Sequence, residues 1–483
     1  MVREEKRVTT HSRTHSPPPT SHTLTSSCRR LYERVSVRGG RELSGRTRAH
    51  TYTHTCTYAH TNTCARSTVA RCAVEALLAS DPEIRIAVFT GDKEPKAEIL
   101  NKAKQRFGID LECSAGRIDF VRLRLRALLE ASCYPAFTLL GQSMGGALLA
   151  LEALLRLTPY VWVDTMGSAP TYLVARYLTG CRVACYVHYP TISTDMLSLV
   201  ERRETSYNNR AIISKSRVLS GAKLVYYRCL AAAYGVAGRA SHSTMVNSSW
   251  THGHISDIWG ESPPPCIVFP PCNTDNLRSI PLEGREQLIV SLGQFRPEKN
   301  HALQVQAMAA LLERHPGSKA RLVIIGSCRN EGDEQRVREV KDDISRLGLG
   351  HCVEVRVNVP WPELKDKWLR HSKIGLHTMV NEHFGINIVE FMAAGVIPVA
   401  HDSGGPRADI VVPWHGKPTG MLASSAASYA DAIHSILSLP EKEFGALQLS
   451  ARASVSRFSD AAFQQAFRKQ WTVALACGQG AAR

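Results

Sequence analysis

The sequence predicts an α/β protein with two Rossmann-like, doubly wound domains that face each other across a cleft, preceded by a disordered extension. Three observations support this fold class. The chain has 483 residues, which is too long for one ordinary domain. Short apolar runs alternate with helical stretches in two successive series, a pattern typical of parallel sheets covered by helices. Proline-rich sequence at 263–271 separates the two series.

Residues 1–68 form the predicted extension. They hold 12 Lys and Arg against 4 Asp and Glu, together with 14 Thr and 6 His, and show no apolar periodicity. Such a segment cannot bury a core, so we expect disorder. Alternating Thr and His is also what a translated CA repeat encodes, and we interpret part of the segment as a misassigned exon. A basic tail that binds nucleic acid is the disfavoured alternative, and we expect no nucleic-acid partner.

The first predicted domain covers residues 69–278. A helical stretch at Val69–Leu78 precedes the apolar run Ile84–Thr90, and this alternation continues along the domain. Five further apolar runs are predicted strands, at Phe137–Leu140, Val161–Val163, Val183–Val187, Thr244–Val246 and Ile267–Phe269. Together they predict a parallel sheet.

The second predicted domain covers residues 279–458, with the boundary between the domains near 275–285. It opens with the apolar run Gln287–Gly293. Four more strands are predicted at Leu322–Ile325, Val353–Val357, Ile374–Leu376 and Ile397–Ala400, with helices around 301–314, 333–347, 361–371, 385–394 and 426–438. Residues 459–483 are predicted to form a C-terminal helix, from Ala461 to about Ala474, and a tail.

Two basic residues follow the first strand of the second domain. Arg296 and Lys299 lie between the end of that strand and the predicted helix at 301–314. Open α/β sheets bind ligands at the carboxyl ends of their strands. A guanidinium, an ammonium group and the amides of a helix N-terminus suit a diphosphate, so this loop is a candidate phosphate site. A solvated basic loop is the alternative.

Two glutamates, Glu382 and Glu390, stand eight residues apart near the predicted helix at 385–394. Glu382 is expected in the loop before the helix, and Glu390 about a turn and a half inside it. With a rise of about 1.5 Å per residue, their carboxylates would lie on the order of 10 Å apart, enough to hold the two ends of a nucleotide sugar. Such pairs are also common on solvated helices.

The segment from Glu382 to Glu390 resembles the E-x7-E motif of the retaining GT-B glycosyltransferases of family four. Other segments resemble one branch of that family, the α-1,2-mannosyltransferases of asparagine-linked glycosylation. They are GQFRPEKNH at 293–301, YVHYPTISTD at 186–195, NSSWT at 247–251, SGGP at 403–406, DIVVP at 409–413 and ARASVSRFS at 451–459. The resemblance covers about residues 69–475 and implies a GT-B fold, with an acceptor domain followed by a GDP-mannose-binding domain.

The resemblance also implies the reaction. Enzymes of this branch transfer mannose from GDP-mannose to the oligosaccharide carried by dolichol pyrophosphate, adding its fourth and fifth mannoses with retention of configuration. In this chain, Arg296 and Lys299 would neutralise the departing GDP diphosphate, and Glu390 would hold the ribose.

The mannose itself is implied to lie between the two domains. Glu382, with the backbone near Gly385 and Ile386, would hold it. His188, in the loop after the predicted strand Val183–Val187, matches the family's first-domain histidine beside the donor sugar, although a buried structural histidine is the alternative. No metal or other cofactor is implied, and the 14 cysteines include no C-x-x-C pair that would indicate a zinc site.

The implied partners are GDP-mannose, the dolichol-linked oligosaccharide, the cytosolic face of the endoplasmic reticulum membrane, and other early mannosyltransferases of the pathway. No uninterrupted apolar run of about 18 residues occurs in the chain. The apolar and aromatic segment Lys223–Val236 either lies in a bilayer interface or forms a core helix. Arg122, Arg124 and Arg126 either meet lipid headgroups or the acceptor pyrophosphate, or form a solvated face.

A serine hydrolase is one alternative. Gly141–Gly145 reads Gly-Gln-Ser-Met-Gly, which fits the G-x-S-x-G nucleophile elbow, with an apolar run before it and a helical stretch after it. Because no Asp and His follow in a recognisable setting, we disfavour Ser143 as a nucleophile.

A catalytically impaired scaffold of the same family is the other alternative. The family carries a hydrophobic anchor and a glycine-rich loop after its first strand, whereas this chain joins the family pattern only near Val69. The sequence therefore predicts that the first strand and the glycine-rich loop are missing, which would leave the N-terminal sheet incomplete.

Overall fold

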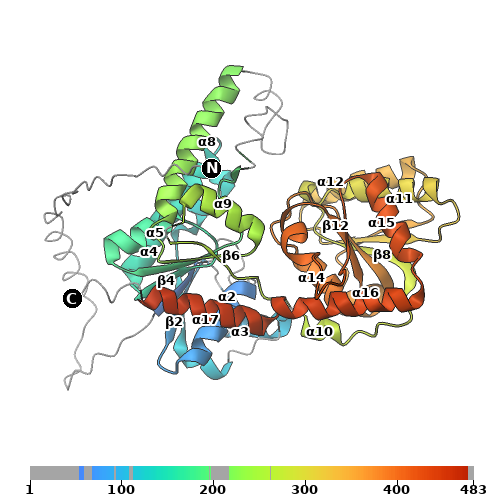
Figure 1. Ribbon diagram of the computed structural model, residues 1–483. Coiled ribbons are helices and arrows are strands. Elements are labelled where there is room, and N and C mark those ends of the chain that lie inside the picture. Colours follow the sequence, from blue (N-terminus) through green and yellow to red (C-terminus); the bar gives the residue numbers. More distant parts are fainter. Residues whose placement is uncertain are drawn as a thin grey trace, which may run out of the picture. The chain divides into compact units, whose positions relative to one another are not determined.

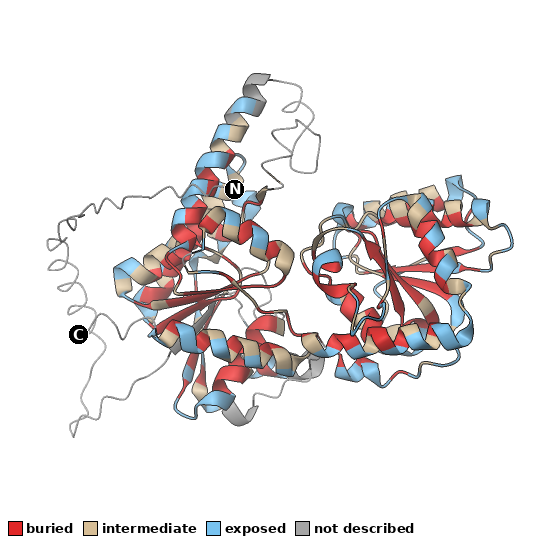
Figure 2. Ribbon diagram, in the orientation of Figure 1, coloured by how far each residue is buried: buried red, intermediate tan, exposed pale blue. Residues whose placement is uncertain are grey.

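The computed structural model describes residues 54–58, 68–91, 94–107, 112–194, 196, 217–261, 263–272 and 274–476. They form two parallel sheets with helices packed against them (Figure 1). Among the strands whose burial the structure describes, the central ones of each sheet are buried and the edge strands are partly exposed (Figure 2). The predicted α/β class with two doubly wound sheets is confirmed.

The N-terminal sheet has the strand order β3-β2-β1-β4-β5-β6-β7, and all neighbouring strands are parallel. Its strands are β1 (His54–Tyr58), β2 (Arg85–Thr90), β3 (Ile118–Arg122), β4 (Val161–Asp164), β5 (Arg182–Val187), β6 (Ser243–Val246) and β7 (Cys266–Ile267). The sequence did not predict β3, because this edge strand buries only Ile118 and so lacks an apolar run.

The structure corrects the prediction that the first strand is missing. Residues His54–Tyr58 form β1, which lies between β2 and β4 in the middle of the sheet. Thr55 is paired with Ile86 of β2 on one side and with Val161 of β4 on the other. Threonine accepts extended backbone readily, and pairing on both sides satisfies the backbone donors and acceptors, which no local apolar pattern reveals. The rest of residues 1–68, including the place of the expected glycine-rich loop, lies outside the described residues.

Helices cover the N-terminal sheet. They are α2 (Thr68–Ser80), α3 (Lys96–Phe107), α4 (Thr138–Arg156), α5 (Pro170–Leu173) with the π-helical turn η5 (Val174–Leu178), α8 (Arg217–Gly238) and α9 (Ser249–Trp259). The predicted strand Phe137–Leu140 is wrong, because Thr138 begins α4 after Phe137 adopts a left-handed φ of 54°. The run is apolar because α4 carries large apolar side chains on its buried and its exposed face alike.

The C-terminal sheet has the strand order β10-β9-β8-β11-β12-β13 and is also parallel. Its strands are β8 (Glu286–Leu292), β9 (Arg321–Gly326), β10 (Val353–Val357), β11 (Ser372–His377), β12 (Ile397–His401) and β13 (Met421–Ala423). Its helices are α10 (Asp275–Arg278), α11 (His301–Arg314), α12 (Glu331–Arg346), α13 (Trp361–Glu363) with the π-helical turn η7 (Leu364–Leu369), α14 (Ile386–Ala393), α15 (Ala426–Leu437) and α16 (Glu441–Ser454). The five predicted strands of this half are confirmed, and β13, α10 and α16 were not predicted.

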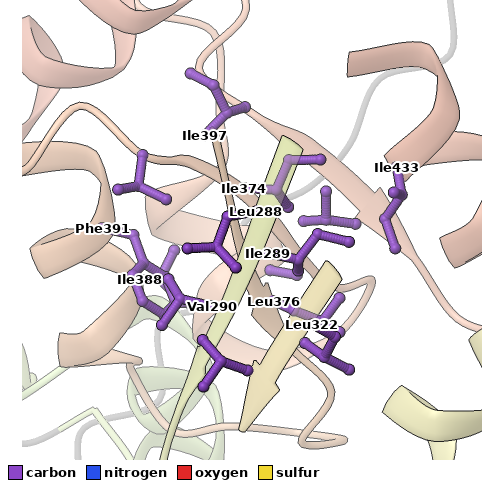
Figure 3. Close-up of a cluster of buried hydrophobic side chains, with 14 of the residues drawn as sticks. Leu288, Ile289, Val290, Leu322, Ile374, Leu376, Ile388, Phe391, Ile397 and Ile433 are labelled. Atoms are coloured by element: carbon purple, nitrogen blue, oxygen red, sulfur yellow. The ribbon is translucent and has the colours of Figure 1, made fainter. Parts of the chain in front are cut away.

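The core of the C-terminal sheet fixes the position of α14. Ile388 and Phe391 of α14 belong to the same buried cluster as Val290 of β8 (Figure 3), and α14 contacts the strands β11 and β12. A side chain at Gly375 of β11 would overlap the Phe391 ring, so the helix lies close against the sheet. Because α14 carries Glu390 on its other side, this packing determines where that carboxylate lies.

The C-terminal helix α17 (Asp460–Ala476) belongs to the N-terminal half of the molecule. Its N-terminus is capped as predicted, since the Ser459 hydroxyl accepts the amide of Ala462. The buried Phe463, Phe467 and Trp471 of α17 join the core beneath the N-terminal sheet, where α17 contacts α2, β5 and β6. The predicted separate segment 459–483 is therefore, over α17, part of the first domain's core.

Candidate active site

One cavity of about 810 Å³ lies at the carboxyl ends of the C-terminal strands, and all seven predicted site residues line it. Six come from the C-terminal half, and His188 comes from the N-terminal half together with Asn247. The six are Arg296, Lys299, Glu382, Gly385, Ile386 and Glu390. The structure thus brings the predicted residues together, while the role of each stays a prediction.

Lys299 is held at the end of a short 3₁₀ turn, Pro297–Lys299, that follows β8. Asn300 adopts a left-handed φ of 50° and begins α11, and the Thr378 hydroxyl donates to the Lys299 carbonyl at 2.9 Å. The ammonium Nζ of Lys299 lies 2.5 Å from Oε2 of Glu382. The turn therefore presents a fixed cation that is paired with the first glutamate of the predicted motif.

Glu382 lies in the loop before α14 and is held by three groups. Its Oε2 contacts Lys299 and lies 3.3 Å from Nε2 of His377, and its Oε1 accepts the amide of His383 at 3.2 Å. Burial raises the pKa of this carboxyl, but the hydrogen bond with His377 and the charge of Lys299 outweigh it and hold the pKa well below its usual range. Glu382 is therefore a carboxylate throughout the physiological pH range.

Two glycines of the segment 403–406 support the Glu382 loop. Gly404 has a left-handed φ of 60°, and a side chain there would overlap the Glu382 carbonyl oxygen. The amide of Gly405 donates to that carbonyl at 2.8 Å, and the Ser403 hydroxyl accepts the amide of Asn381 at 2.8 Å. The glycines of the Ser-Gly-Gly-Pro segment therefore let its backbone lie in direct contact with the backbone of the Glu382 loop.

Glu390 is in a different electrostatic state from Glu382. It lies inside α14, whose N-cap Gly385 has a left-handed φ of 110°. Within the described residues, no hydrogen bond or ion pair to its carboxylate is found, and burial raises its pKa to about 7. The side chain is half-buried and lines the cavity. A ligand hydroxyl that donates to it would supply the partner that the protein lacks.

The N-terminus of α14 also faces the cavity. Gly385, Ile386 and Asn387 line it, and the first amides of a helix have no acceptor within the helix. The Asn387 side chain donates to the Leu292 carbonyl at 2.8 Å and so ties α14 to the end of β8. These amides and the helix dipole favour a negatively charged ligand at this end of the cavity.

Arg296 is the more exposed of the two cations: its side chain is 44% exposed and forms an ion pair with Glu298 at 3.7 Å. Lys299, by contrast, is only 23% exposed. The cavity therefore combines one largely buried cation, paired with Glu382, and one exposed cation, paired with Glu298.

His188 reaches the cavity from the end of β5. Burial lowers its pKa to about 4, with a further contribution from His383, while a hydrogen bond with the backbone of Thr165 acts in the opposite direction. The imidazole is therefore neutral at physiological pH. The Asn247 side chain donates to the His188 carbonyl at 2.9 Å, which holds the loop that carries it.

The sequence did not single out an aromatic cluster at the same cleft. Tyr189 of the N-terminal half stacks on His383 of the C-terminal half, with 4.1 Å between ring centroids, and Trp250 lies 5.2 Å from the same imidazole. Beside them, the Asp409 carboxylate accepts the amide of Ser249 at 2.8 Å and its hydroxyl at 2.5 Å. These residues all lie in segments that carry the family resemblance, but their pattern alone gave no sign that the three rings would meet.

Ser143 does not lie on a nucleophile elbow. The whole Gly141–Gly145 segment lies inside α4, and a side chain at Gly145 would overlap the Leu128 carbonyl. A nucleophile elbow requires a sharp turn between a strand and a helix, and here the helix simply continues. The pentapeptide instead lets α4 pack closely, so the serine-hydrolase alternative is wrong on its structural premise.

In the part of the chain that the structure describes, no three His, Cys, Asp or Glu side chains are arranged so that they could hold a metal ion. Of the charged groups that line the cavity, Lys299 is paired with Glu382 and Arg296 with Glu298.

Comparison with known proteins identifies relatives along most of the chain. The sequence matches the family described as ALG11 mannosyltransferase N-terminus over residues 55–259, from within β1, and that described as Glycosyl transferases group 1 over residues 273–446. It is 48% identical to a protein of Mus musculus and 49% identical to one of Xenopus laevis, each over 404 residues. These alignments cover 82% of this chain and 81% and 82% of the two relatives, both named GDP-Man:Man(3)GlcNAc(2)-PP-Dol alpha-1,2-mannosyltransferase.

A solved structure shares the fold at low identity. The sucrose-phosphate synthase of Thermosynechococcus elongatus superposes with a TM-score of 0.63 at 15% identity, covering 88% of this chain and 100% of that protein.

Proposed function

This chain belongs to the GDP-Man:Man(3)GlcNAc(2)-PP-Dol alpha-1,2-mannosyltransferase family and has the GT-B fold, and from that premise we propose that it transfers mannose from GDP-mannose to a dolichol-pyrophosphate-linked oligosaccharide. The linkage is α-1,2 and the anomeric configuration is retained. The observation that carries the proposal is the convergence of Arg296, Lys299, Glu382 and Glu390 on one cavity beside a helix N-terminus.

The donor diphosphate binds between the cations and the start of α14. Arg296 turns its exposed guanidinium toward the phosphates, and Lys299 supplies a second positive charge from a fixed position. The amides at Gly385 and Ile386 add donors that require no reorganisation. As the sugar–phosphate bond breaks, negative charge grows on the leaving diphosphate, and this prearranged positive potential stabilises it.

The two glutamates hold the two ends of the donor. Glu390 accepts hydrogen bonds from the ribose hydroxyls, which gives its carboxylate the partner that it lacks among the described residues. Glu382 is ionised and held by Lys299 and His377, and it accepts hydrogen bonds from the mannose hydroxyls. No metal is required in this arrangement, because the diphosphate charge is met by side chains and amides.

His188 approaches the mannose from the N-terminal half. Its neutral imidazole can donate or accept a hydrogen bond without adding charge next to a developing oxocarbenium ion. The acceptor hydroxyl attacks from the same face that the diphosphate leaves, and the departing phosphate oxygen takes its proton, so the configuration is retained.

The acceptor places the enzyme at a membrane. A dolichol chain cannot leave the bilayer, so the protein works at the surface of the endoplasmic reticulum membrane, on the cytosolic face where GDP-mannose is found. Other early mannosyltransferases that act on the same lipid are the expected neighbours in this setting.

A transfer assay tests the proposal. Full-length chain is incubated in detergent with radiolabelled GDP-mannose and a trimannosyl lipid-linked acceptor, next to the same chain carrying a glycine-rich loop in place of residues 59–67. Formation of α-1,2-linked products by the unmodified chain supports the proposal, whereas products from the loop-bearing variant alone identify the chain as an impaired form of the family. If neither transfers mannose while both bind GDP-mannose, the chain is an impaired form of the family.

A further inference from the structure

We propose that the exposed side of α4 is the surface that docks this protein on an anionic lipid membrane. Six positions of α4 are exposed, and five of them are apolar: Leu140, Met144, Leu148, Leu151 and Leu155, hereafter the α4 face. Their exposed fractions lie between 36% and 62%. At 100° per residue, all five lie within one narrow arc of the helix, so they form a continuous stripe.

The α4 face is unusual among the surface helices of this protein. On α12, which is nearly as long, the exposed side chains are charged or polar, among them Glu334, Arg338, Lys341 and Asp342. Soluble surfaces rarely leave an apolar stripe of this kind open to water, because the exposed apolar area costs free energy. A function that covers the stripe is therefore required.

The helix lies on a membrane and does not cross one. It is long and apolar enough to span a bilayer, and among the described residues no other helix meets those two criteria. However, its opposite side, including Leu149, Ala150, Ala153 and Leu154, is packed in the core on the face of the N-terminal sheet opposite to α17. A helix that is half of a folded core can present only its other half to lipid.

The charges around α4 fit phosphate headgroups. Its one acidic residue, Glu152, is turned away from the stripe, where its carboxylate accepts the backbone amides of Arg124 and Leu125 and pairs with Arg156 at 2.8 Å. These contacts hold the pKa of Glu152 below its usual value against the effect of burial. Arg124, whose backbone amide donates to Glu152 of α4, has an exposed side chain, and so has Arg122 two residues before it. Cations at the edge of an apolar stripe are typical of helices that lie in an anionic interface.

Apolar and aromatic groups continue the surface at the first turn of α4. Phe137 is 65% exposed and its ring lies 5.2 Å from that of Tyr226 on α8, whose hydroxyl accepts the Leu140 amide. Val225 of α8 is 61% exposed. Aromatic rings beside an apolar stripe suit the headgroup level of a bilayer. The segment Lys223–Val236 was expected either in a bilayer interface or as a core helix, and one side of it is in the core, where Tyr227, Leu230 and Tyr234 are buried. Its exposed Val225 adds an edge to the surface, while α4, which was not predicted, supplies the main stripe.

This inference rests on the proposed function, because the lipid-linked acceptor is what favours a membrane, and not a partner protein, as the surface that covers the α4 face. Vesicle flotation with the full-length chain tests it without any need for turnover. Two kinds of vesicle are compared, phosphatidylcholine alone and phosphatidylcholine mixed with phosphatidylinositol. Leu148→Glu and Leu155→Glu each place a carboxylate on the α4 face, and Leu449→Glu is the matched control, since Leu449 is 60% exposed on α16.

The expected result is stronger binding to the anionic vesicles and a loss on the order of tenfold for each α4 variant, because a charge replaces buried apolar area. Leu449→Glu leaves binding unchanged, and Met144→Trp, which enlarges the stripe, strengthens it. If a glutamate variant fails to fold, vesicle binding by Met144→Trp still tests whether the α4 face contacts the membrane.

Three results would overturn the inference: equal binding by the α4 variants and wild type, an equal loss with Leu449→Glu, or a change only in self-association measured by sedimentation. The last result would make the stripe an interface between copies of the chain. The detergent transfer assay separates this inference from the proposed function. If the α4 variants lose vesicle binding and the wild-type chain transfers no mannose, the docking surface is supported and the proposed enzyme activity is contradicted. If the α4 variants bind vesicles as the wild type does and the wild-type chain transfers mannose, the activity is supported and the docking surface is contradicted.

Discussion

The two halves of the molecule contribute opposite kinds of group to the same cleft. The C-terminal half provides the charges, with Lys299 and Glu382 paired at 2.5 Å and Glu390 beside a helix N-terminus. The N-terminal half provides a neutral imidazole, His188, and the ring of Tyr189. On its outer surface, the same N-terminal half exposes the apolar α4 face. The difference fits our proposal that the charged C-terminal half holds the donor, whereas the N-terminal half positions an acceptor and its lipid.

The largest expected effect comes from removing the fixed cation. Lys299→Ala leaves the Glu382 carboxylate beside His377 without its ion pair. It also removes the positive charge that would stabilise the leaving diphosphate. We expect turnover to fall on the order of 10³-fold. Initial rates of radiolabelled mannose transfer measure this, with Lys299→Arg as the variant that keeps the charge. A Lys299→Ala enzyme with near-normal turnover would show that the C-terminal charges do not carry the chemistry.

A second prediction concerns pH and distinguishes the two glutamates. Because burial raises the pKa of Glu390 to about 7, its carboxyl is protonated below that pH and ionised above it. Ribose hydroxyls donate best to the ionised form, so GDP affinity should rise severalfold between about pH 6 and pH 8. Calorimetric titration with GDP checks this, and Glu390→Gln should flatten that profile. Glu382, whose pKa is held well below its usual range, adds no change in this window. An equally steep profile in Glu390→Gln would assign the dependence to another group.

A third prediction concerns the contacts that join the two halves at the cleft. Tyr189→Ala removes the ring that stacks on His383, and Asp409→Asn weakens the hydrogen bonds to Ser249. Each should reduce kcat/KM for the acceptor by about tenfold, since a contact of this kind contributes on the order of 1 kcal/mol or more. Tyr189→Phe serves as the control, because it keeps the ring and should retain most of the activity. Equal losses in GDP binding would mean that these residues serve the donor half instead.

The smallest expected effect is that of Ser143→Ala. Ser143 lies inside α4 and contributes nothing to the cavity, so transfer rates should be unchanged within error. Labelling by a fluorophosphonate probe supplies the complementary readout, and the wild-type chain should not react. Covalent labelling of Ser143 would revive a hydrolase function that the helix geometry opposes.

The convergence of the charged residues of the C-terminal half could be predicted because its signals are local. Arg296 and Lys299 follow one strand within a few residues, and Glu382 and Glu390 belong to one loop and helix, so sequence spacing largely determines where they meet. Strands β9 and β12 of that half are apolar on both faces and therefore easy to recognise.

The N-terminal half was harder for identifiable reasons. Strand β1 has a Thr-rich sequence that reads as polar, and only its pairing with β2 and β4 on both sides makes it a strand. The start of α4 reads as a buried strand because its exposed positions are apolar, which is a feature of its surface and not of its core. The stacking of Tyr189, Trp250 and His383 depends on three separate segments meeting across the cleft, which no spacing along the chain indicates.

The most direct test of the central claim is calorimetric binding of GDP-mannose to the Arg296→Ala/Lys299→Ala double variant. Arg314→Ala is the matched control, because Arg314 is 45% exposed on α11 and lies outside the cavity, whereas Arg296 is 44% exposed and lines it. We expect the double variant to lose donor affinity by about 100-fold or more, and Arg314→Ala to bind as the wild type does. Wild-type affinity in the double variant would contradict the claim that these two cations hold the sugar nucleotide.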